Sequence, residues 1–251
     1  MSTMSKIMII PMALAVFILP VDVANAQVVS MKEYNPVMLN LATLFDFDAF
    51  RGPVRTFEST LKDADGKTVF RASGAFNQQG CIEYFKTEDG KGVNHDYKRS
   101  GDRLVSQINH QDVMTLTKDC LLESNTTNGS TMTYTYDANK LMHQILLQPS
   151  NTLLSLHQYN SNHLPTDIRF FINGMTASRM EITYEDEKNR PYDYILKQSY
   201  TIGNGESYMK RKCQYDVYAN PASCTLTMAK DKDFSEITWV RHVHSVATWF
   251  E

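Results

Sequence analysis

Two short segments each place a pair of potential metal ligands close together. Asp46 and Asp48 flank a phenylalanine in FDFDAF, and His242 and His244 flank a valine in TWVRHVHSVATWF. Residues two apart in an extended chain lie on one face, so each pair would point the same way. Carboxylates suit calcium, and paired imidazoles suit zinc or copper. Neither segment supplies a third ligand, so both pairs are weak candidates.

Each pair also has a structural interpretation. The phenylalanines of FDFDAF would pack in a core, while its aspartates cap a helix or pair with Arg51 or Arg55. The two histidines would lie on one face of a sheet. The sequence contains no GxSxG motif and no P-loop, and no Ser-His-Asp order can be argued for. We therefore expect no catalytic residue, no bound metal and no cofactor.

The four cysteines are Cys81, Cys120, Cys213 and Cys224. An even number in an exported chain favours disulfides, and four thiols allow three pairings. Proximity favours Cys213 with Cys224, which leaves Cys81 with Cys120. CQYDVYANPASC reads as a tight turn between two strands, which would bring Cys213 opposite Cys224. A zinc site and a redox-active thiol near Lys210–Lys212 are the alternatives.

Residues 1–26 predict a secretory signal peptide. Lys6 precedes an apolar run from Ile7 to Val21, and Ala24-Asn25-Ala26 is a small-residue cleavage pattern. A membrane anchor needs about 20 apolar residues, whereas this run is shorter and contains prolines. The mature chain would begin at Gln27 and be soluble in the periplasm, without a transmembrane segment. A net charge of -3 favours neither nucleic acid nor an anionic lipid surface.

The mature chain, 27–251, predicts a single domain that is mainly β. Asn35-Pro36 followed by Val37, Met38, Leu41, Leu44 and Phe45 predicts one short helix. From Val54 onward, short runs rich in Val, Ile, Thr, Phe and Tyr alternate with Asp/Asn/Gly turns. This pattern predicts an antiparallel meander that forms an open curved sheet or a partly closed barrel. Polar SNTTNGST at 124–131 is predicted to be a mobile loop.

Aromatic residues crowd the C-terminal half of the chain. They are Tyr134, Tyr136, Tyr159, Phe170, Phe171, Tyr184, Tyr192, Tyr194, Tyr200, Tyr208 and Tyr215. Such residues on an antiparallel sheet usually stabilise cross-strand pairs. An open sheet face lined by them would instead bind a ligand.

Three segments resemble a known family. FDFDAFRGPVRTFESTL at 45–61, GCI at 80–82 and CQYDVYANPASCTL at 213–226 are similar to the YnfC-like family of Gram-negative envelope lipoproteins, whose function is uncharacterised. The four cysteines lie in corresponding places, which supports the pairing given above. Members of that family carry an acylated lipobox cysteine, but this chain has no cysteine before Cys81. The lipid anchor is therefore not carried over, and the resemblance implies no catalytic residue.

These observations predict an exported periplasmic protein that binds a ligand or has a structural role and is not an enzyme. The partner would be a small molecule, a glycan, a lipid or an envelope protein. The alternative is a metal-dependent or hydrolytic periplasmic enzyme, which would require the carboxylates or histidines to cluster in one cleft.

Overall fold

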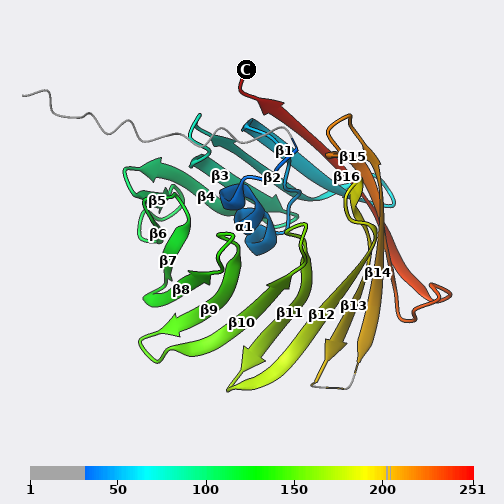
Figure 1. Ribbon diagram of the computed structural model, residues 1–251. Coiled ribbons are helices and arrows are strands. Elements are labelled where there is room, and N and C mark those ends of the chain that lie inside the picture. The colour runs from blue at the N-terminus through cyan, green and yellow to red at the C-terminus, as the bar shows by residue number, and fades with distance from the viewer. Residues whose placement is uncertain (1–31, 202, 204) are drawn as a thin grey trace, which may run out of the picture.

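The described part of the chain forms a closed antiparallel β-barrel around one helix. The computed structural model describes residues 32–201, 203 and 205–251. Each strand pairs with the next one in sequence, and β1 closes the barrel by pairing with β16. Figure 1 shows α1 inside the ring of strands. The mainly β meander with one short N-terminal helix is confirmed, and the barrel is fully closed.

The helix is α1 (Pro36–Phe45). The strands are β1 (Val54–Asp63), β2 (Thr68–Phe76), β3 (Ile82–Asp89), β4 (Gly92–Ser100), β5 (Arg103–Ser106), β6 (Val113–Leu116), β7 (Leu122–Thr127), β8 (Ser130–Tyr136), β9 (Met142–Gln148), β10 (Thr152–Tyr159), β11 (Pro165–Ile172), β12 (Met175–Asp186), β13 (Arg190–Tyr200), β14 (Glu206–Tyr215), β15 (Pro221–Ala229) and β16 (Ile237–Trp249).

Helix α1 begins and ends at residues that are suited to those positions. The side chain of Asn35 accepts a hydrogen bond from the N–H of Val37 (2.9 Å), and Pro36 occupies the first turn. Asp46 ends the helix in the left-handed conformation, with φ at 56°. The apolar positions Val37, Met38 and Leu41 are buried. Local capping and an apolar face therefore explain why this segment is helical.

At one end of the barrel, four turns share the same hydrogen-bond pattern and backbone conformation. In the turns β6–β7, β8–β9, β10–β11 and β14–β15, an Asp, Asn or Thr side chain accepts a hydrogen bond from the backbone N–H four residues later. The residue before that N–H has positive φ in each turn: Cys120, Lys140, His163 and Ala219. The residue that donates is buried: Leu121, Leu141, Leu164 or Asn220. This geometry turns the chain back and directs a side chain into the protein.

Helix α1 closes this end of the barrel, which we call the closed end. Asn40 donates its amide to the carbonyl of Lys140 and accepts from the N–H of Met142, both at 2.8 Å. Asn35 donates to the carbonyl of Gly80 at 2.7 Å. A Cβ on Gly80 would lie 2.5 Å from the Asn35 amide nitrogen, so only glycine fits this turn. The helix is thus attached to two separate turns by side-chain hydrogen bonds.

The outer wall of the barrel is polar. On β3, Phe85 and Thr87 are buried inside, so Lys86 and Glu88 point outward, where they form an ion pair. Glu58 on β1 and Arg71 on β2 form another on the same outer surface (3.6 Å). These ion pairs give the outer surface of β1–β3 a charged character.

Among the described residues, no helix combines the length and apolar character needed to cross a bilayer.

The predicted mobile loop at 124–131 is wrong. This segment forms the end of β7 and the start of β8, joined at Asn128-Gly129. Both turn residues have positive φ, 50° and 78°, which the type I′ hairpin turn requires. The hydroxyls of Thr126 and Thr131 lie 2.9 Å apart across the two strands. Polar side chains here belong to a hairpin. The predicted signal peptide, 1–26, lies outside the described residues.

Candidate functional site

The FDFDAF segment lies inside the barrel, directly after α1. We call α1 together with residues 46–51 the plug. The Phe45 ring lies 4.6 Å from that of Phe85, and the Phe47 ring stacks on Phe57 at 4.6 Å. Both phenylalanines therefore pack on the inner faces of β1 and β3, as the structural interpretation predicted. Gly74 makes room for this packing, because a Cβ there would lie 2.6 Å from the Phe57 ring.

The two aspartates of the segment have different roles. Asp48 is 2% exposed and accepts a hydrogen bond from Arg211 of β14 at 2.5 Å. Its other oxygen accepts from Ser245 of β16 at 2.7 Å, and Ser245 lies 2.9 Å from Ser59 of β1. The partner of Asp48 is therefore Arg211, and the expected pairing with Arg51 or Arg55 is wrong. Asp46 caps α1 and is exposed to water.

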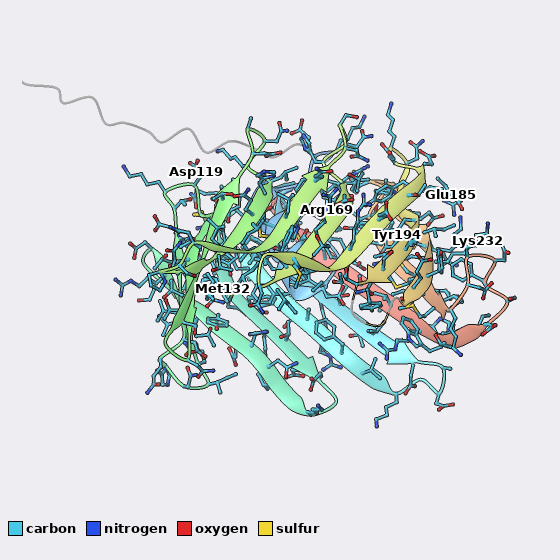
Figure 2. The ribbon with its side chains drawn as sticks, turned by 90° about the horizontal axis from the view of Figure 1, so that it is seen from below. Asp119, Met132, Arg169, Glu185, Tyr194 and Lys232 are labelled. Carbon is cyan, nitrogen blue, oxygen red and sulfur yellow. A yellow bond between two sulfur atoms is a disulfide. The ribbon has the colours of Figure 1, made fainter. Side chains whose placement is uncertain are left out.

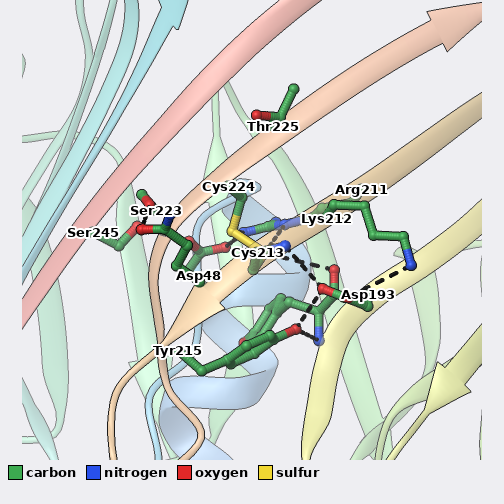
Figure 3. Close-up of a disulfide and its surroundings, with 12 residues drawn as sticks. Asp48, Asp193, Arg211, Lys212, Cys213, Tyr215, Ser223, Cys224, Thr225 and Ser245 are labelled. Carbon is green, nitrogen blue, oxygen red and sulfur yellow. Dashed lines mark hydrogen bonds and ion pairs between the residues drawn. A yellow bond between two sulfur atoms is a disulfide. The ribbon is translucent and has the colours of Figure 1, made fainter.

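Arg211 joins the plug to the disulfide between Cys213 and Cys224. Its guanidinium lies 3.1 Å from the sulfur of Cys224 and 3.4 Å from that of Cys213 (Figure 3). It also stacks over the Tyr192 ring at 4.8 Å. Burial works against the charge, but the adjacent Asp48 carboxylate outweighs it, so the pKa of Arg211 is raised overall. The buried guanidinium is thus held as a cation.

One disulfide joins adjacent strands of the barrel, and the other joins two turns. Cys213 of β14 faces Cys224 of β15, with Cα atoms 4.0 Å apart. Cys81 precedes β3 and joins Cys120, which precedes β7, with Cα atoms 5.4 Å apart. The second link connects two turns of the closed end. It therefore fixes strands that are not adjacent in the barrel.

Two of the three segments that carry the family resemblance meet in space. The N–H of Arg51, from FRGPV, donates to the side chain of Asn220, from YANP, at 2.6 Å. The indole of Trp249 donates to the carbonyl of Arg51 at 2.9 Å. The hydroxyl of Tyr192 donates to the carbonyl of Ala49 at 2.6 Å. These contacts together attach the plug to β13–β16, which gives the first and third segments a structural role.

Strands β12–β16 carry a continuous apolar row on their inner face, which we call the apolar row. Its members pair successively across the five strands: Ile182, Leu196, Met209, Met228 and Trp239. Arg211 precedes Met209 by two residues and reaches the plug, so this face points inward. All five side chains are nonetheless half-buried. Water therefore reaches apolar side chains on the inside of the barrel.

The inner faces of β1–β6, by contrast, pack tightly against α1. Phe57, Ala72, Phe85, Leu104 and Met114 point inward and are almost fully buried, in one cluster with α1. The plug fills the side of the barrel lined by β1–β9 and leaves the inner wall of β12–β16 less covered. Figure 2 shows the side chains that line the strands, with Tyr194 of β13 and Glu185 of β12 labelled. The candidate site is this less covered inner wall.

A second row on the inner face lies two residues along each strand from the apolar row, toward the closed end. It contains two arginines. It consists of Tyr184, Tyr194, Arg211, Leu226 and Arg241. Arg241 is half-buried and lies over the Trp239 ring at 4.5 Å. Burial raises the pKa of Asp46, whereas the charges of Arg211 and Arg241 lower it. Asp46 is water-accessible and yet surrounded by protein, as expected for a group that lines an interior space.

The tyrosine hydroxyls serve mainly as backbone anchors. Tyr136, Tyr159 and Tyr184 donate to the carbonyls of Leu122, Met142 and Pro165 at 2.6–2.9 Å. Burial raises the pKa of Tyr136, Tyr159 and Tyr184 above the usual range. The predicted aromatic binding face is therefore less aromatic than expected. The partly buried side chains on this face are largely Ile, Leu and Met. The abundance of tyrosines in the sequence did not predict them.

The histidine pair lies outside the barrel, apart from the aspartates. His242 and His244 alternate with the inward-facing Val243 and Ser245, and both are exposed. Among the described residues, no group of three or more His, Cys, Asp or Glu side chains is placed to hold a metal ion. The expectation that these four residues could share one cleft is therefore wrong.

One serine–histidine pair was not predicted. Ser155 and His157, on the inner face of β10, are 2.9 Å apart between Oγ and Nε2. Both are at least 95% buried, and Nδ1 of His157 has no hydrogen-bond partner among the described residues. A catalytic pair needs a group that orients the imidazole and access for substrate. This pair therefore has the geometry of a packed core contact.

His157 should make stability depend on pH. Burial, followed by the charge of His143, lowers its pKa from 6.5 to about 4. Between these values the unfolded chain binds the extra proton, so the free energy of unfolding falls as the pH falls, and the contribution is complete above pH 6.5. We expect the wild type to lose about 2 kcal/mol more than His157→Gln between pH 7.5 and pH 5. Urea unfolding at both pH values tests this, and equal losses would contradict it.

Comparison with known proteins gives the family. The chain is 25% identical over 212 residues to the UPF0257 lipoprotein YnfC of Salmonella heidelberg, covering 80% of this chain and 83% of the relative. It is 24% identical over 236 residues to the protein of the same name from Escherichia coli K12, covering 90% and 92%. A porin-like protein from Bacteroides uniformis covers 78% of this chain and 98% of its own, with 12% identity and a TM-score of 0.43.

The family model matches nearly the whole chain, including the plug, both disulfides and the apolar row. Its match runs over residues 5–246. The chain belongs to the Uncharacterised protein family (UPF0257).

Proposed function

We propose that this protein is a non-enzymatic binding protein of the cell envelope that holds a small apolar or amphipathic molecule against the inner wall of β12–β16. The observation that carries the proposal is the apolar row, five apolar side chains on an inward face that are only partly buried. Apolar surface left in contact with water inside a barrel is favourable to cover. An apolar ligand would gain about 25 cal/mol for each Å² removed from water.

The end of the barrel opposite α1 supports this proposal. Exposed apolar side chains gather on the hairpins β11–β12, β13–β14 and β15–β16: Phe170, Ile172, Met175, Tyr200 and Ile237. Consecutive turns of a meander lie at alternate ends, so these hairpins lie opposite the closed end. Ile172 and Met175 are 57% and 70% exposed. Apolar side chains at this end would be the first that an entering ligand meets.

The proposed location rests on the relatives and on the cysteines. The relatives are named lipoproteins, and the two disulfides of this structure suit an oxidising compartment. A secretory signal at residues 1–26 and maturation at Gln27, as a soluble periplasmic protein, complete the proposal. A chain with a cleaved leader would be recovered from the periplasm without detergent. Retention in the membrane fraction would contradict it.

Fluorescence titration with 1-aminoanthracene tests binding. Leu196 points inward and Ile195 points outward on the same strand, and both are half-buried. Leu196→Glu places a carboxylate on the inner wall, so we expect the affinity for the probe to fall at least tenfold. Ile195→Glu makes the same chemical change on the outer wall and should leave the affinity unchanged. Binding that is absent from the wild type, or equal in both variants, would contradict the proposal.

A further inference from the structure

We propose that the ligand of this inner wall is a single-chain amphiphile with a zwitterionic head group, whose cationic part is bound at Asp46 and whose anionic part is bound at Arg241. The inference rests on the proposed function and specifies the chemistry of its ligand. The side chains involved are Asp46 at the end of α1, Arg241 on β16 and the apolar row between β12 and β16.

Asp46 is a carboxylate without a partner inside the protein. It follows α1, whose last carbonyls leave the negative end of the helix dipole next to it. Among the described residues, no hydrogen bond or ion pair involves its side chain. The neighbouring Arg211 is already bound to Asp48 at 2.5 Å. A cationic group of a ligand would therefore find an accessible, unneutralised carboxylate.

Arg241 is a cation that, like Asp46, has no ion-pair partner among the described residues. It pairs with Leu226 of β15 and Asp63 of β1 in the inner row, and its guanidinium lies over the face of the Trp239 ring. Asp63 uses its Oδ1 atom to accept the N–H groups of Asp65 and Lys67 in the β1–β2 turn. No ion pair to Arg241 is formed among the described residues. Its five donors suit a phosphate or carboxylate.

Asp46 and Arg241 are near one another without neutralising each other. Asp46 is two residues from Asp48, which contacts Arg211 of β14 and Ser245 of β16, and Arg241 lies in the same inner row as Arg211. Burial raises the pKa of Asp46 overall, and the charge of Arg241 opposes that rise, yet the two side chains form no ion pair in the described structure. A head group with one positive and one negative charge would fit between them. The apolar row begins one step further from the closed end, at Trp239 and Met228, and would receive the alkyl chain.

Four compounds with twelve-carbon chains test the contribution of the head group separately from that of the chain. They are dodecylphosphocholine, laurate, dodecyltrimethylammonium and dodecyl maltoside, each used below its micelle concentration to displace 1-aminoanthracene. On the wild type, we expect dodecylphosphocholine to bind at least tenfold more tightly than dodecyl maltoside. We also expect it to bind more tightly than either singly charged compound.

Two variants assign the charges. Asp46→Asn keeps the side-chain shape and the tolerance for positive φ, and should weaken dodecylphosphocholine at least tenfold while laurate binds as well or better. Arg241→Gln should weaken dodecylphosphocholine similarly while dodecyltrimethylammonium binds as well or better. Glu58→Gln and Arg71→Gln make the same changes on the outer wall and should alter nothing.

The possible failures are distinguishable. Equal binding of all four compounds, or a preference that both inner variants leave intact, would overturn the head-group assignment and leave the binding function standing. Failure of every compound to displace the probe, dodecyl maltoside included, would overturn both.

Discussion

Replacing Arg211 with methionine is expected to destabilise the protein by about 3–5 kcal/mol, because the buried carboxylate of Asp48 would lose its ion-pair partner. Domains of this kind have a total unfolding free energy of about 5–15 kcal/mol, so this loss is large. Methionine fills much of the volume of the arginine stem and limits the loss from packing. The measurement is urea unfolding of both proteins at pH 7.5.

Two further variants separate the ion pair from other effects of the substitution. Adding Asp48→Asn to Arg211→Met removes the uncompensated charge, so much of the lost stability should return. Arg71→Met removes an arginine whose ion pair with Glu58 is about half-exposed on both sides, and should cost less than about 1 kcal/mol. If Arg211→Met cost no more than Arg71→Met, the buried pair would not be what attaches the plug to β14.

The parts of the fold that could be predicted are those encoded locally. Asn35 and Pro36 determine the start of α1 through contacts within two residues, and the side chain of Asp137 organises a whole turn from within it. Such interactions depend on adjacent residues, so the sequence displays them directly. The segment 124–131 resembles a loop in sequence because its residues are polar on both faces of the hairpin. The Asn128-Gly129 turn was the more reliable signal.

Closure of the barrel and the pairing of Asp48 could not be predicted in this way. Closure brings Ser59 of β1 next to Ser245 of β16, 186 residues later, and neither residue type indicates its partner. Asp48 binds Arg211, 163 residues away, although Arg51 and Arg55 are nearer in sequence. Sequence distance is a poor guide here, because a closed sheet places the first and last strands side by side.

The apolar row was missed for a related reason. Its five members come from five strands, with one residue from each, so no single stretch of sequence is unusually apolar. Tyrosines were more conspicuous in the sequence, but several of them anchor the backbone. A row of this kind becomes visible only when the register of neighbouring strands is known.

Removing the disulfide between Cys81 and Cys120 is expected to cost more than removing the one between Cys213 and Cys224. The two cysteines are 39 residues apart in the first pair and 11 in the second. The entropy of closing these loops corresponds to about 4 kcal/mol for the longer loop and about 3 kcal/mol for the shorter one. Urea unfolding of the two double serine variants under identical conditions measures the difference.

Serine makes the comparison a fair one, because its hydroxyl can still accept a hydrogen bond from the arginine beside each disulfide. Arg99 lies 3.6 Å from the sulfur of Cys120, and Arg211 lies 3.1 Å from that of Cys224. The remaining difference between the variants is then mainly the length of the released loop. A larger loss in the Cys213→Ser/Cys224→Ser variant would contradict this account. Contacts of that disulfide with Arg211 and the plug would then outweigh loop length in stabilising the barrel.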